Sequence, residues 1–300
     1  MDRFFGMQVF VAVAEAQGFA AAARRLALSP PAVTRAIGAL EQRLGVKLLQ
    51  RTTRIVRLTE AGARYLQDCK RLLREVEDAE QGVSGALGEL KGPLAVTASV
   101  TFGRLFVAPI LLEFLGQHPK VQGRALLVDR VVDLIEEGLD VGVRIAHLAD
   151  ASFTAIRVGS VRQVVCASPA YLKRAGVPQS PRNLADCATI CFSPERAAPA
   201  WSFQLGKQIV SVRPRARLVV NSTEVAMQAA IAGAGVTRVF SYLAASEVKA
   251  GRLRVILREF EPEPVPIHVI HREGKQAAAR VRAFVDFVVA KLRGNPLLKS

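Results

Sequence analysis

Residues 18–45 constrain the fold of this chain most, because they read as two short helices joined by a tight turn. Ala, Leu and Arg dominate the first helix and favour it. Ser29 can cap the second helix, and Pro30 at its first position removes no hydrogen bond there. Four apolar residues of the second helix recur at intervals of three or four: Val33, Ile37, Leu40 and Leu44. The pattern predicts a helix-turn-helix that presents its second helix to a DNA major groove, with a two-helix hairpin inside a core as the alternative.

The segments on either side favour the helix-turn-helix. Residues 5–16 are predominantly apolar and predict a helix that covers it. Residues 46–59 place two short apolar runs around a basic, Thr-rich tip, which predicts a β-hairpin wing suited to phosphate or minor-groove contact. A solvated basic hairpin is the alternative. The residues expected to contact DNA are Ser29, Pro31, Ala32, Thr34, Arg35, Gly38, Arg51, Thr52, Thr53 and Arg54.

A long helix is predicted from residue 59, with Thr59 as its N-cap and Glu60 in its first turn. Its apolar residues repeat at intervals of seven along a narrow seam, which predicts pairing with another helix. The chain contains no second copy of this helix, so we expect self-association through Leu66, Cys69, Leu73, Val76, Val83 and Leu87. Gly92-Pro93 ends the helix. The predicted regions are a winged helix-turn-helix (1–58), a dimerisation linker helix (59–92) and an effector-binding domain (93–300).

Residues 93–300 alternate predicted strands and helices, which is typical of α/β domains with mostly parallel sheets. Helices are expected at about 103–116, 131–139, 169–176, 224–235, 243–251 and 276–292, and strands at 94–98, 126–128, 141–146, 162–168, 216–221, 236–240, 252–257 and 265–272. The stretch around Trp201 reads as irregular. Two such sets predict lobe I at about 93–162 and 266–300 and lobe II at about 163–265, with a ligand crevice between them.

Candidate ligand contacts lie where strands end beside this crevice: Ser99, Val100, Thr101, Arg144, Ser193 and Thr223. The first three join a strand to its helix, where hydroxyl and N–H groups can hold an anion, with plain helix capping as the alternative. Thr223 occupies the corresponding turn of lobe II. Arg144 alternates with its apolar strand neighbours and reaches either the crevice or solvent. We therefore expect a small-molecule effector, which would be anionic if the site at Ser99, Val100 and Thr101 binds it.

The chain of 300 residues carries a formal net charge of +15, which indicates a polyanionic partner. Residues 1–92 hold a net charge of +4 and residues 93–300 a net charge of +11, so charge alone does not locate a DNA site. The extra charge can flank bent DNA, attract an anionic ligand or aid solubility, and we favour solubility. Four cysteines without a CxxC pair, and the lack of a signal peptide or an apolar run of about 18 residues, predict a cytoplasmic protein.

Enzymatic activity is not expected. His118 and His147 have no nucleophile positioned beside them, and His268 and His271 lie three apart on a predicted strand, so they face opposite sides. No hydrolase, zinc-protease, P-loop or dinucleotide motif occurs. We therefore expect no catalytic residue, no metal and no cofactor. A ligand-independent architectural DNA-binding protein is another alternative, but the two lobes argue against it, because tethering alone needs no crevice.

The spacing of the N-terminal motifs resembles that of the LysR-type transcriptional regulators. The likeness is carried by AAARRL at 21–26, by the pattern from Leu28 to Gly45, by Arg51 with Arg54, and by LTEAG at 58–62. Weaker matches, including FLGQHP and VDLIEEGLDVGVRIAHL, extend it over nearly the whole chain. The resemblance implies an α+β multidomain protein with a winged helix-turn-helix, a linker helix that pairs in a dimer, and a two-lobed α/β effector domain resembling type 2 periplasmic binding proteins.

The resemblance also implies partners: double-stranded promoter DNA, further copies of the chain in a homodimer or homotetramer, a small-molecule effector that switches the regulator, and RNA polymerase. The chain departs from the family pattern in places. Pro30 stands where the family often has Gln, so Thr34 and Arg35 must carry more of the base readout. Ala20 stands where Ser or Thr usually caps a helix, and Ala146 replaces a frequent Gly at the end of the strand into the crevice.

Overall fold

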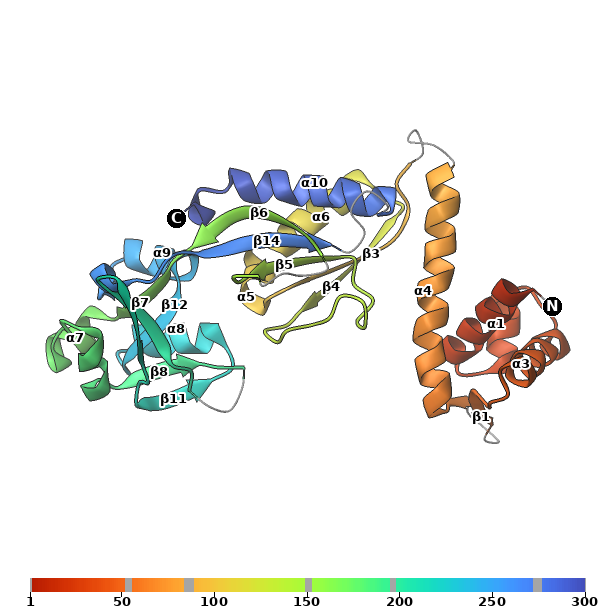
Figure 1. Ribbon diagram of the computed structural model, residues 1–300, viewed down its shortest axis with the longest axis horizontal. Coiled ribbons are helices and arrows are strands. Elements are labelled where there is room, and N and C mark those ends of the chain that lie inside the picture. The colour runs from red at the N-terminus through yellow and green to blue at the C-terminus, as the bar shows by residue number, and fades with distance from the viewer. Residues whose placement is uncertain are drawn as a thin grey trace. The chain divides into compact units, whose positions relative to one another are not determined.

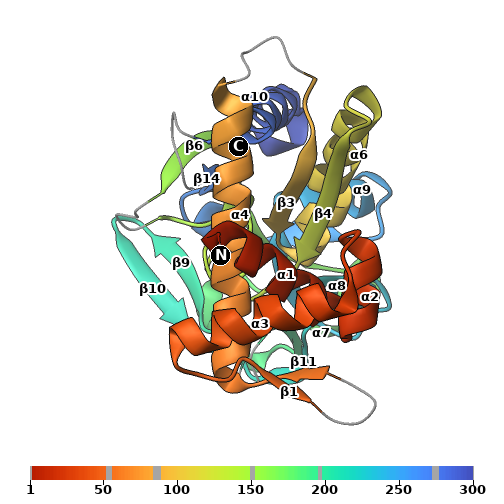
Figure 2. The ribbon, with the colours of Figure 1, turned by 90° about the vertical axis from the view of Figure 1, so that its right-hand side faces the viewer.

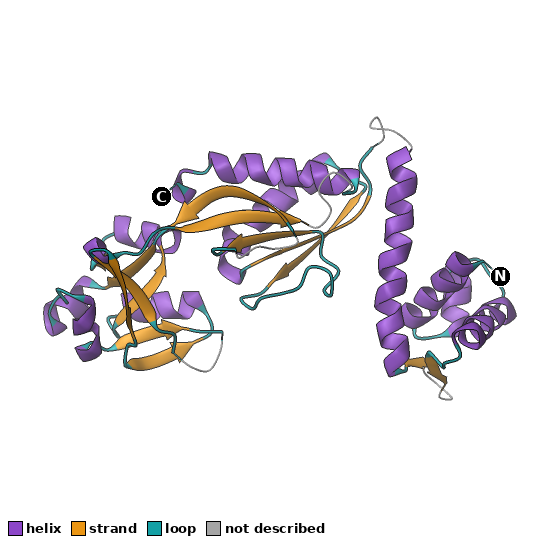
Figure 3. Cartoon of the chain, viewed as in Figure 1, coloured by secondary structure: helices purple, strands orange, loops and turns teal. Residues whose placement is uncertain are grey.

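The computed structural model describes residues 2–51, 56–83, 89–148, 153–194, 198–271 and 277–299. The chain forms two compact units, the first consisting mainly of Met1–Gly88 and the second mainly of Glu89–Ser300. Figure 1 labels the helices and strands, and Figure 3 distinguishes the largely helical first unit from the second, in which sheets and helices pack together. Each unit has a hydrophobic core of its own.

The N-terminal unit contains α1 (Arg3–Ala16), α2 (Phe19–Arg25), α3 (Pro30–Leu44), β1 (Leu49–Arg51), β2 (Val56–Leu58) and α4 (Glu60–Val83). Its core gathers the apolar faces of the first three helices with the start of α4. β1 and β2 pair antiparallel. The predicted covering helix, helix-turn-helix and wing hairpin are therefore confirmed, while the wing tip at 52–55 lies outside the described residues. The long helix is confirmed from residue 60 to residue 83, but its predicted end at Gly92-Pro93 is wrong, because residues 89–91 are not helical and a strand begins at Gly92.

The boundaries of α3 follow from its caps. The Ser29 hydroxyl accepts a hydrogen bond from the Ala32 N–H at 3.4 Å, and Gly45 ends the helix at φ +68°. Val33 lies in the core as predicted, but Leu44 is 39% exposed, because it belongs to the last turn and points away from the core. Helix α2 begins at Phe19, so Ala20 lies inside the helix and is not its cap.

The C-terminal unit contains two five-stranded sheets. The first, in lobe I, has the strand order β4 (Val121–Leu127), β3 (Gly92–Ala98), β5 (Val141–Ile145), β14 (Val265–His271), β6 (Thr154–Val161). The second, in lobe II, has the order β11 (Ala216–Val220), β8 (Thr189–Phe192), β12 (Val236–Phe240), β7 (Gln163–Ala167), β13 (Arg254–Ile256).

The prediction of mostly parallel sheets is wrong. In each sheet, half of the neighbouring strand pairs are parallel and half are antiparallel. The chain passes from β6 of lobe I to β7 of lobe II and returns from β13 to β14. Strands β7 and β14 enter their sheets from the other lobe, and both run antiparallel to their two neighbours.

Helices cover one face of the lobe I sheet: α5 (Val100–Phe102), a π-helical turn (Gly103–Val107), α6 (Ala108–Gln117) and α10 (Ala279–Gly294), with a short 3₁₀ helix at Pro296–Leu298. The rings of Phe114 on α6 and Phe284 on α10 meet at 5.2 Å. The segment Val100–Gln117 is long and apolar enough to cross a membrane, contrary to the expectation that no such run exists. Phe102 and Phe114 are buried in the core of lobe I, however, so one face of this segment packs against the sheet.

The helix predicted at 131–139 is wrong, because residues 134–138 form a turn. Gly138 adopts φ +61°, which interrupts a right-handed helix. The Leu139 N–H donates to the Leu134 carbonyl at 2.8 Å, and both side chains are buried against the second face of the sheet. The helix-like apolar spacing thus belongs to a loop that packs its leucines inward.

Lobe II places α8 (Thr223–Ile231) and α9 (Ser241–Lys249) on one face of its sheet. The other face is covered by α7 (Pro169–Ala175), by 3₁₀ helices at Pro181–Asp186 and Arg258–Phe260, and by a hairpin of β9 (Trp201–Leu205) and β10 (Gln208–Val212). The irregular stretch expected around Trp201 is therefore wrong: Trp201 and Phe203 alternate inward along a strand, while Ser202 between them is exposed.

Candidate nucleic-acid interface and effector site

Helix α3 presents one face outward and buries the other. Pro31, Arg35 and Gly38 are exposed, and Ala32 and Thr34 are half-buried. Figure 2 shows α3 running across the N-terminal unit above the β1–β2 hairpin. A Cβ added at Gly38 would meet no atom within 4 Å, so nothing in this unit requires glycine there. The missing side chain at Gly38 leaves room for a DNA backbone or base edge to approach this face of the helix closely.

The carboxylate of Glu41 fixes α3 to the wing. Glu41 is 7% exposed, and its oxygens accept hydrogen bonds from the backbone N–H groups of Leu48 at 3.0 Å and Leu49 at 3.2 Å. Lys47 Nζ lies 2.6 Å from the same carboxylate. Burial raises the pKa of Glu41, but the lysine and the two backbone N–H groups outweigh burial, so the pKa lies below its ordinary value. Glu41 therefore stays charged and orients the wing.

Thr59 and Gly62 join the wing to α4. The Thr59 hydroxyl donates to the Lys47 carbonyl at 2.8 Å and accepts from the Gly62 N–H at 2.9 Å, which confirms Thr59 as the N-cap. A Cβ at Gly62 would lie 2.0 Å from the carbonyl oxygen of Leu48. Only glycine allows α4 to begin this close to the backbone of the wing.

Some of the predicted DNA contacts lie in the wing. Arg51 closes β1, but its side chain is not described, and Thr52, Thr53 and Arg54 lie outside the described residues. Arg57 on β2 is exposed and lies opposite Gln50 in the hairpin. Arg57 is therefore an exposed basic residue of the wing that was not among the predicted DNA contacts.

The seam predicted along α4 divides into two parts. Cys69 is fully buried in the core of the N-terminal unit, so its assignment to a dimer seam is wrong. Leu66 also packs against that core, because the first turns of α4 lie on α1, where Lys70 Nζ approaches the Glu15 carboxylate at 2.8 Å. Leu73 and Val76 follow this region and are half-buried, while the Val83 side chain and Leu87 are outside the described residues.

One donor of the anion site predicted at the start of α5 is already bonded to a group of the protein. The Val100 N–H donates to the Asp129 carboxylate at 3.0 Å. Ser99 is the N-cap residue, but its side chain makes no capping hydrogen bond. The Val100 N–H is therefore not free for an anion, because a resident carboxylate takes that position.

Two further predicted ligand contacts, Arg144 and Ser193, lie apart from the start of α5. Arg144 donates to the Val132 carbonyl at 3.2 Å, and burial lowers its pKa. Ser193 is 7% exposed, and its N–H donates to the Val220 carbonyl at 2.8 Å, which extends the β8–β11 pairing. Both residues thus make hydrogen bonds within the fold, and their contact with a ligand stays a prediction.

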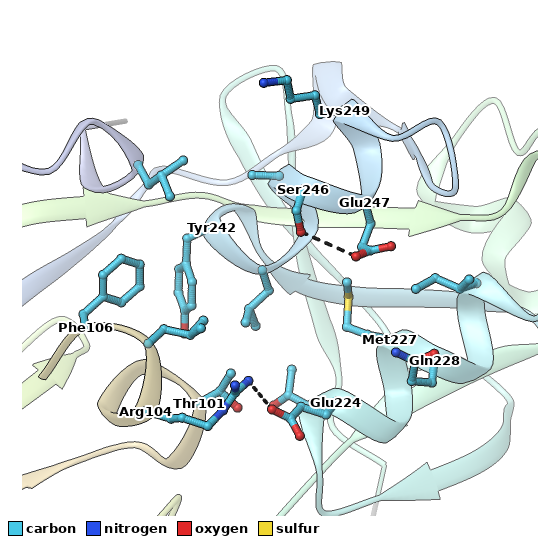
Figure 4. Close-up of a pocket in the computed structure, with 16 residues that line it drawn as sticks. Thr101, Arg104, Phe106, Glu224, Met227, Gln228, Tyr242, Ser246, Glu247 and Lys249 are labelled. Carbon is cyan, nitrogen blue, oxygen red and sulfur yellow. Dashed lines mark hydrogen bonds and ion pairs between the residues drawn. The ribbon is translucent and has the colours of Figure 1, made fainter. Parts of the chain in front are cut away.

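Thr101 and Thr223, by contrast, line one cavity of about 740 Å³ together. Lobe I contributes the helical segment from Thr101 to Phe106, and lobe II contributes α8 and α9, with Tyr242 on α9, as the close-up in Figure 4 shows. The guanidinium of Arg104 pairs with the carboxylate of Glu224 across the cavity. This ion pair joins the two lobes.

Sequence reasoning missed Arg104, Glu224 and the apolar residues that form the cavity. Thr101 and Arg104 lie three apart in one helical segment, and Thr223 adjoins Glu224, so the predicted threonines marked the right places. The π-helical turn at Gly103–Val107 is a local irregularity of the kind that is frequent at functional sites, but nothing in the sequence signals it.

Known protein families match both units. Residues 5–63 match the family described as bacterial regulatory helix-turn-helix protein, lysR family, and residues 87–293 match the LysR substrate binding domain. An HTH-type transcriptional repressor of Pseudomonas aeruginosa is 32% identical over 298 residues, covering 99% of this chain and 94% of that protein. The HTH-type transcriptional activator AaeR of Escherichia coli is 31% identical, covering 95% and 93%.

Solved structures agree over the full length. CrgA, a LysR-type transcriptional regulator from Neisseria meningitidis, has a TM-score of 0.62 and 30% sequence identity, covering 97% of this chain and 99% of that chain. The Vibrio cholerae virulence activator AphB shares the fold with a TM-score of 0.63, at 23% identity and with coverage of 96% and 99%. The matches agree with the two features described above, the outward-facing α3 beside its wing and the two-lobed unit with an interlobe cavity. The chain belongs to the LysR-type family of DNA-binding transcriptional regulators, not to an enzyme family.

Proposed function

We propose that this regulator reads promoter DNA through the outer face of α3, using Ser29, Pro31, Ala32, Thr34, Arg35 and Gly38, with the wing residues Arg51, Thr52, Thr53 and Arg54 on the DNA backbone or minor groove. The observation that carries the proposal is the exposure of Arg35 beside Gly38 on a helix whose opposite face is buried. Arg35 has no ion-pair partner within the described part of the chain, so its guanidinium is available to a base edge.

The Arg35→Ala variant tests this proposal. We expect it to weaken binding to the DNA upstream of the protein's own gene by about 1–3 kcal/mol while changing binding to random DNA little, because a base-reading arginine gives sequence preference. Fluorescence anisotropy at fixed salt measures both affinities. Arg254→Ala, which removes an exposed arginine from β13 of the C-terminal unit, is the matched control. Equal losses on both DNAs would assign Arg35 to a phosphate and refute the reading role.

Self-association through α4 is the second part of the proposal. Leu73 and Val76 form the described part of the seam, and Val83 and Leu87 extend it in sequence. Regulators of this family act as oligomers, and a narrow apolar stripe on a charged helix needs a partner helix to cover it.

Val76→Glu is expected to halve the particle mass at micromolar concentration, because it places an unpaired charge within an apolar helix–helix contact. Light scattering coupled to size-exclusion chromatography measures the mass. Gln67→Glu adds the same charge at an exposed position of α4 and should leave the mass unchanged. An unchanged mass for Val76→Glu would remove Val76 from the interface.

We further propose that the protein acts in the cytoplasm, where promoter DNA is accessible, and that a small molecule in the C-terminal unit controls its binding. Thr101 and Thr223 support this location, because they come from different lobes and line the same cavity. A ligand that contacts both lobes binds one lobe arrangement more tightly than another and so shifts the population between them.

A further inference from the structure

We propose that the cavity between the lobes binds an uncharged, largely apolar small molecule that carries a hydrogen-bonding group. This inference rests on the proposed function, since it names the class of effector that the C-terminal unit would accept. It departs from the anionic effector expected from the sequence, and it follows from the walls of the cavity, its charge balance and the position of its polar groups.

Apolar side chains form most of the walls. Phe106, Met227 and Tyr242 are each less than 10% exposed and lie around the cavity in Figure 4. The rings of Phe106 and Tyr242 meet edge to face at 5.4 Å, which fixes the orientation of both walls. A volume of about 740 Å³ lies within the range of small-molecule sites. Such walls favour a ligand with a ring or a branched apolar body.

The charged groups of the cavity neutralise one another. Arg104 pairs with Glu224, and Glu247 receives two hydrogen bonds from Arg252, at 2.5 Å and 2.9 Å. Lys249 is exposed at the rim, where water screens its charge. An anionic ligand would compete with the Glu224 carboxylate for Arg104, and a cationic ligand would compete with the guanidinium; because both side chains are 57% exposed, this competition is modest. An uncharged ligand leaves these pairs intact.

At each of the two helix starts beside the cavity, one backbone donor is already taken. The Val100 N–H at the start of α5 is hydrogen-bonded to Asp129, and the Val225 N–H in the first turn of α8 donates to the Ser222 hydroxyl at 3.4 Å. Glu224 also lies in the first turn of α8, where its charge complements the helix dipole. An anion at either helix start would therefore compete with a carboxylate of the protein, Asp129 or Glu224.

Hydroxyl groups supply the polar contact. In Figure 4 the Tyr242 hydroxyl points toward the end of the cavity where Thr101 and Arg104 lie. Burial and the nearby Asp129 carboxylate raise the pKa of Tyr242, so its phenol stays protonated. A neutral phenol and a threonine hydroxyl can both donate and accept, which suits a hydroxyl, carbonyl or amide group on the ligand.

Two fluorescent probes with the same carbon skeleton test the charge class directly. N-phenyl-1-naphthylamine is uncharged, and 1-anilinonaphthalene-8-sulfonate differs from it by a sulfonate group. We expect the full-length protein to bind the uncharged probe about tenfold more tightly, because the sulfonate would lose its hydration in the cavity while Lys249, the one unpaired cation among the described lining residues, lies at the exposed rim. Equal or tighter binding of the sulfonate within the cavity would overturn the proposal.

Two variants of α8 test whether the probe binds in the cavity. Gln228 is an exposed residue that lines the cavity, whereas Val225 is an exposed residue of α8 that does not. Gln228→Trp should fill the cavity and weaken binding of the uncharged probe about tenfold or more, while Val225→Trp should leave it unchanged. Equal affinities in both variants would place the probe elsewhere and overturn the site.

The charge balance has its own test. Glu224→Gln frees Arg104 without changing the shape of the side chain, so the sulfonate probe should bind about two- to fivefold more tightly than it binds to wild type. Glu113→Gln, which breaks an ion pair with Lys291 on the surface of lobe I, is the control and should have no effect. An unchanged sulfonate affinity in Glu224→Gln would show that Glu224 does not neutralise the cavity.

DNA binding by the same preparations separates this inference from the proposed function. A protein that binds its upstream DNA but shows no cavity-dependent probe binding would contradict the ligand class alone. A protein that binds the probe in the cavity but has no affinity for DNA would contradict the proposed function instead.

Discussion

The Gly62→Ala variant is expected to destabilise the N-terminal unit by about 3 kcal/mol, because its new Cβ would collide with backbone. That Cβ would lie 2.0 Å from the Leu48 carbonyl oxygen and 2.9 Å from the carbonyl carbon. Moving a side chain cannot relieve this clash, because both atoms belong to the backbone. The Thr59 hydroxyl also holds this backbone in place through the Lys47 carbonyl and the Gly62 N–H. The start of α4 would have to separate from the wing.

Denaturant unfolding followed by far-UV circular dichroism measures this loss. Trp201 is the only tryptophan and lies in the C-terminal unit, so its fluorescence reports that unit separately and should not change. Gly38→Ala is the matched control in the same unit, because Gly38 is helical and has open space around it. Alanine there should stabilise the helix by up to about 1 kcal/mol. Equal stabilities of the two variants would refute the close approach at Gly62.

Glu41→Ala is expected to lower the stability of the N-terminal unit by about 3 kcal/mol, because the buried N–H groups of Leu48 and Leu49 lose their acceptor. The paired Lys47 is mostly exposed and contributes little. Glu15→Ala is the control: Glu15 pairs with Arg25 and Lys70, but it is one-third exposed, so its removal should lower stability by at most about 1 kcal/mol. Similar losses for both carboxylates would contradict the special position of Glu41.

The Glu41 carboxylate should also make the stability of the N-terminal unit depend on pH. The pKa of Glu41 is lowered from 4.5 in the folded chain, so its charge stabilises the fold above that pH, and the stabilisation is lost as the pH falls through the folded pKa. The stability difference between wild type and Glu41→Gln should therefore shrink as the pH drops from about 7 to about 3. A difference that stays constant over this range would show that charge on Glu41 is not what holds the wing.

Local patterns predicted the N-terminal unit well. The apolar spacing of α3, the cap at Ser29 and the N-cap at Thr59 depend on residues within one or two helical turns. The structure contains both caps and buries three of the four apolar positions, all but Leu44. The function of Glu41 was not predicted, because its partners are the N–H groups of residues beyond the end of its helix. Cys69 fits a seven-residue repeat but lies in the core, since the first turns of α4 belong to the N-terminal unit.

The C-terminal unit was predicted less well because its features depend on distant contacts. The apolar spacing of residues 131–139 is helix-like, yet Gly138 and the inward leucines make a turn. Arg104 and Glu224 meet across 120 residues of sequence, and no local pattern marks that pairing. Thr101 and Thr223 were predicted to contact a ligand because they follow strands at the sheet edge, and the tertiary fold places both beside the same cavity.

We propose that a dimer of this chain reads a DNA sequence. The most direct test selects genomic fragments that the purified full-length protein binds and then measures its affinity for the enriched sequence. We predict enrichment of a site with two related half-sites, bound roughly 1,000-fold more tightly than random DNA at the same salt concentration. No enrichment, or equal affinity for enriched and random DNA, would contradict the assignment of α3 as a sequence-reading helix.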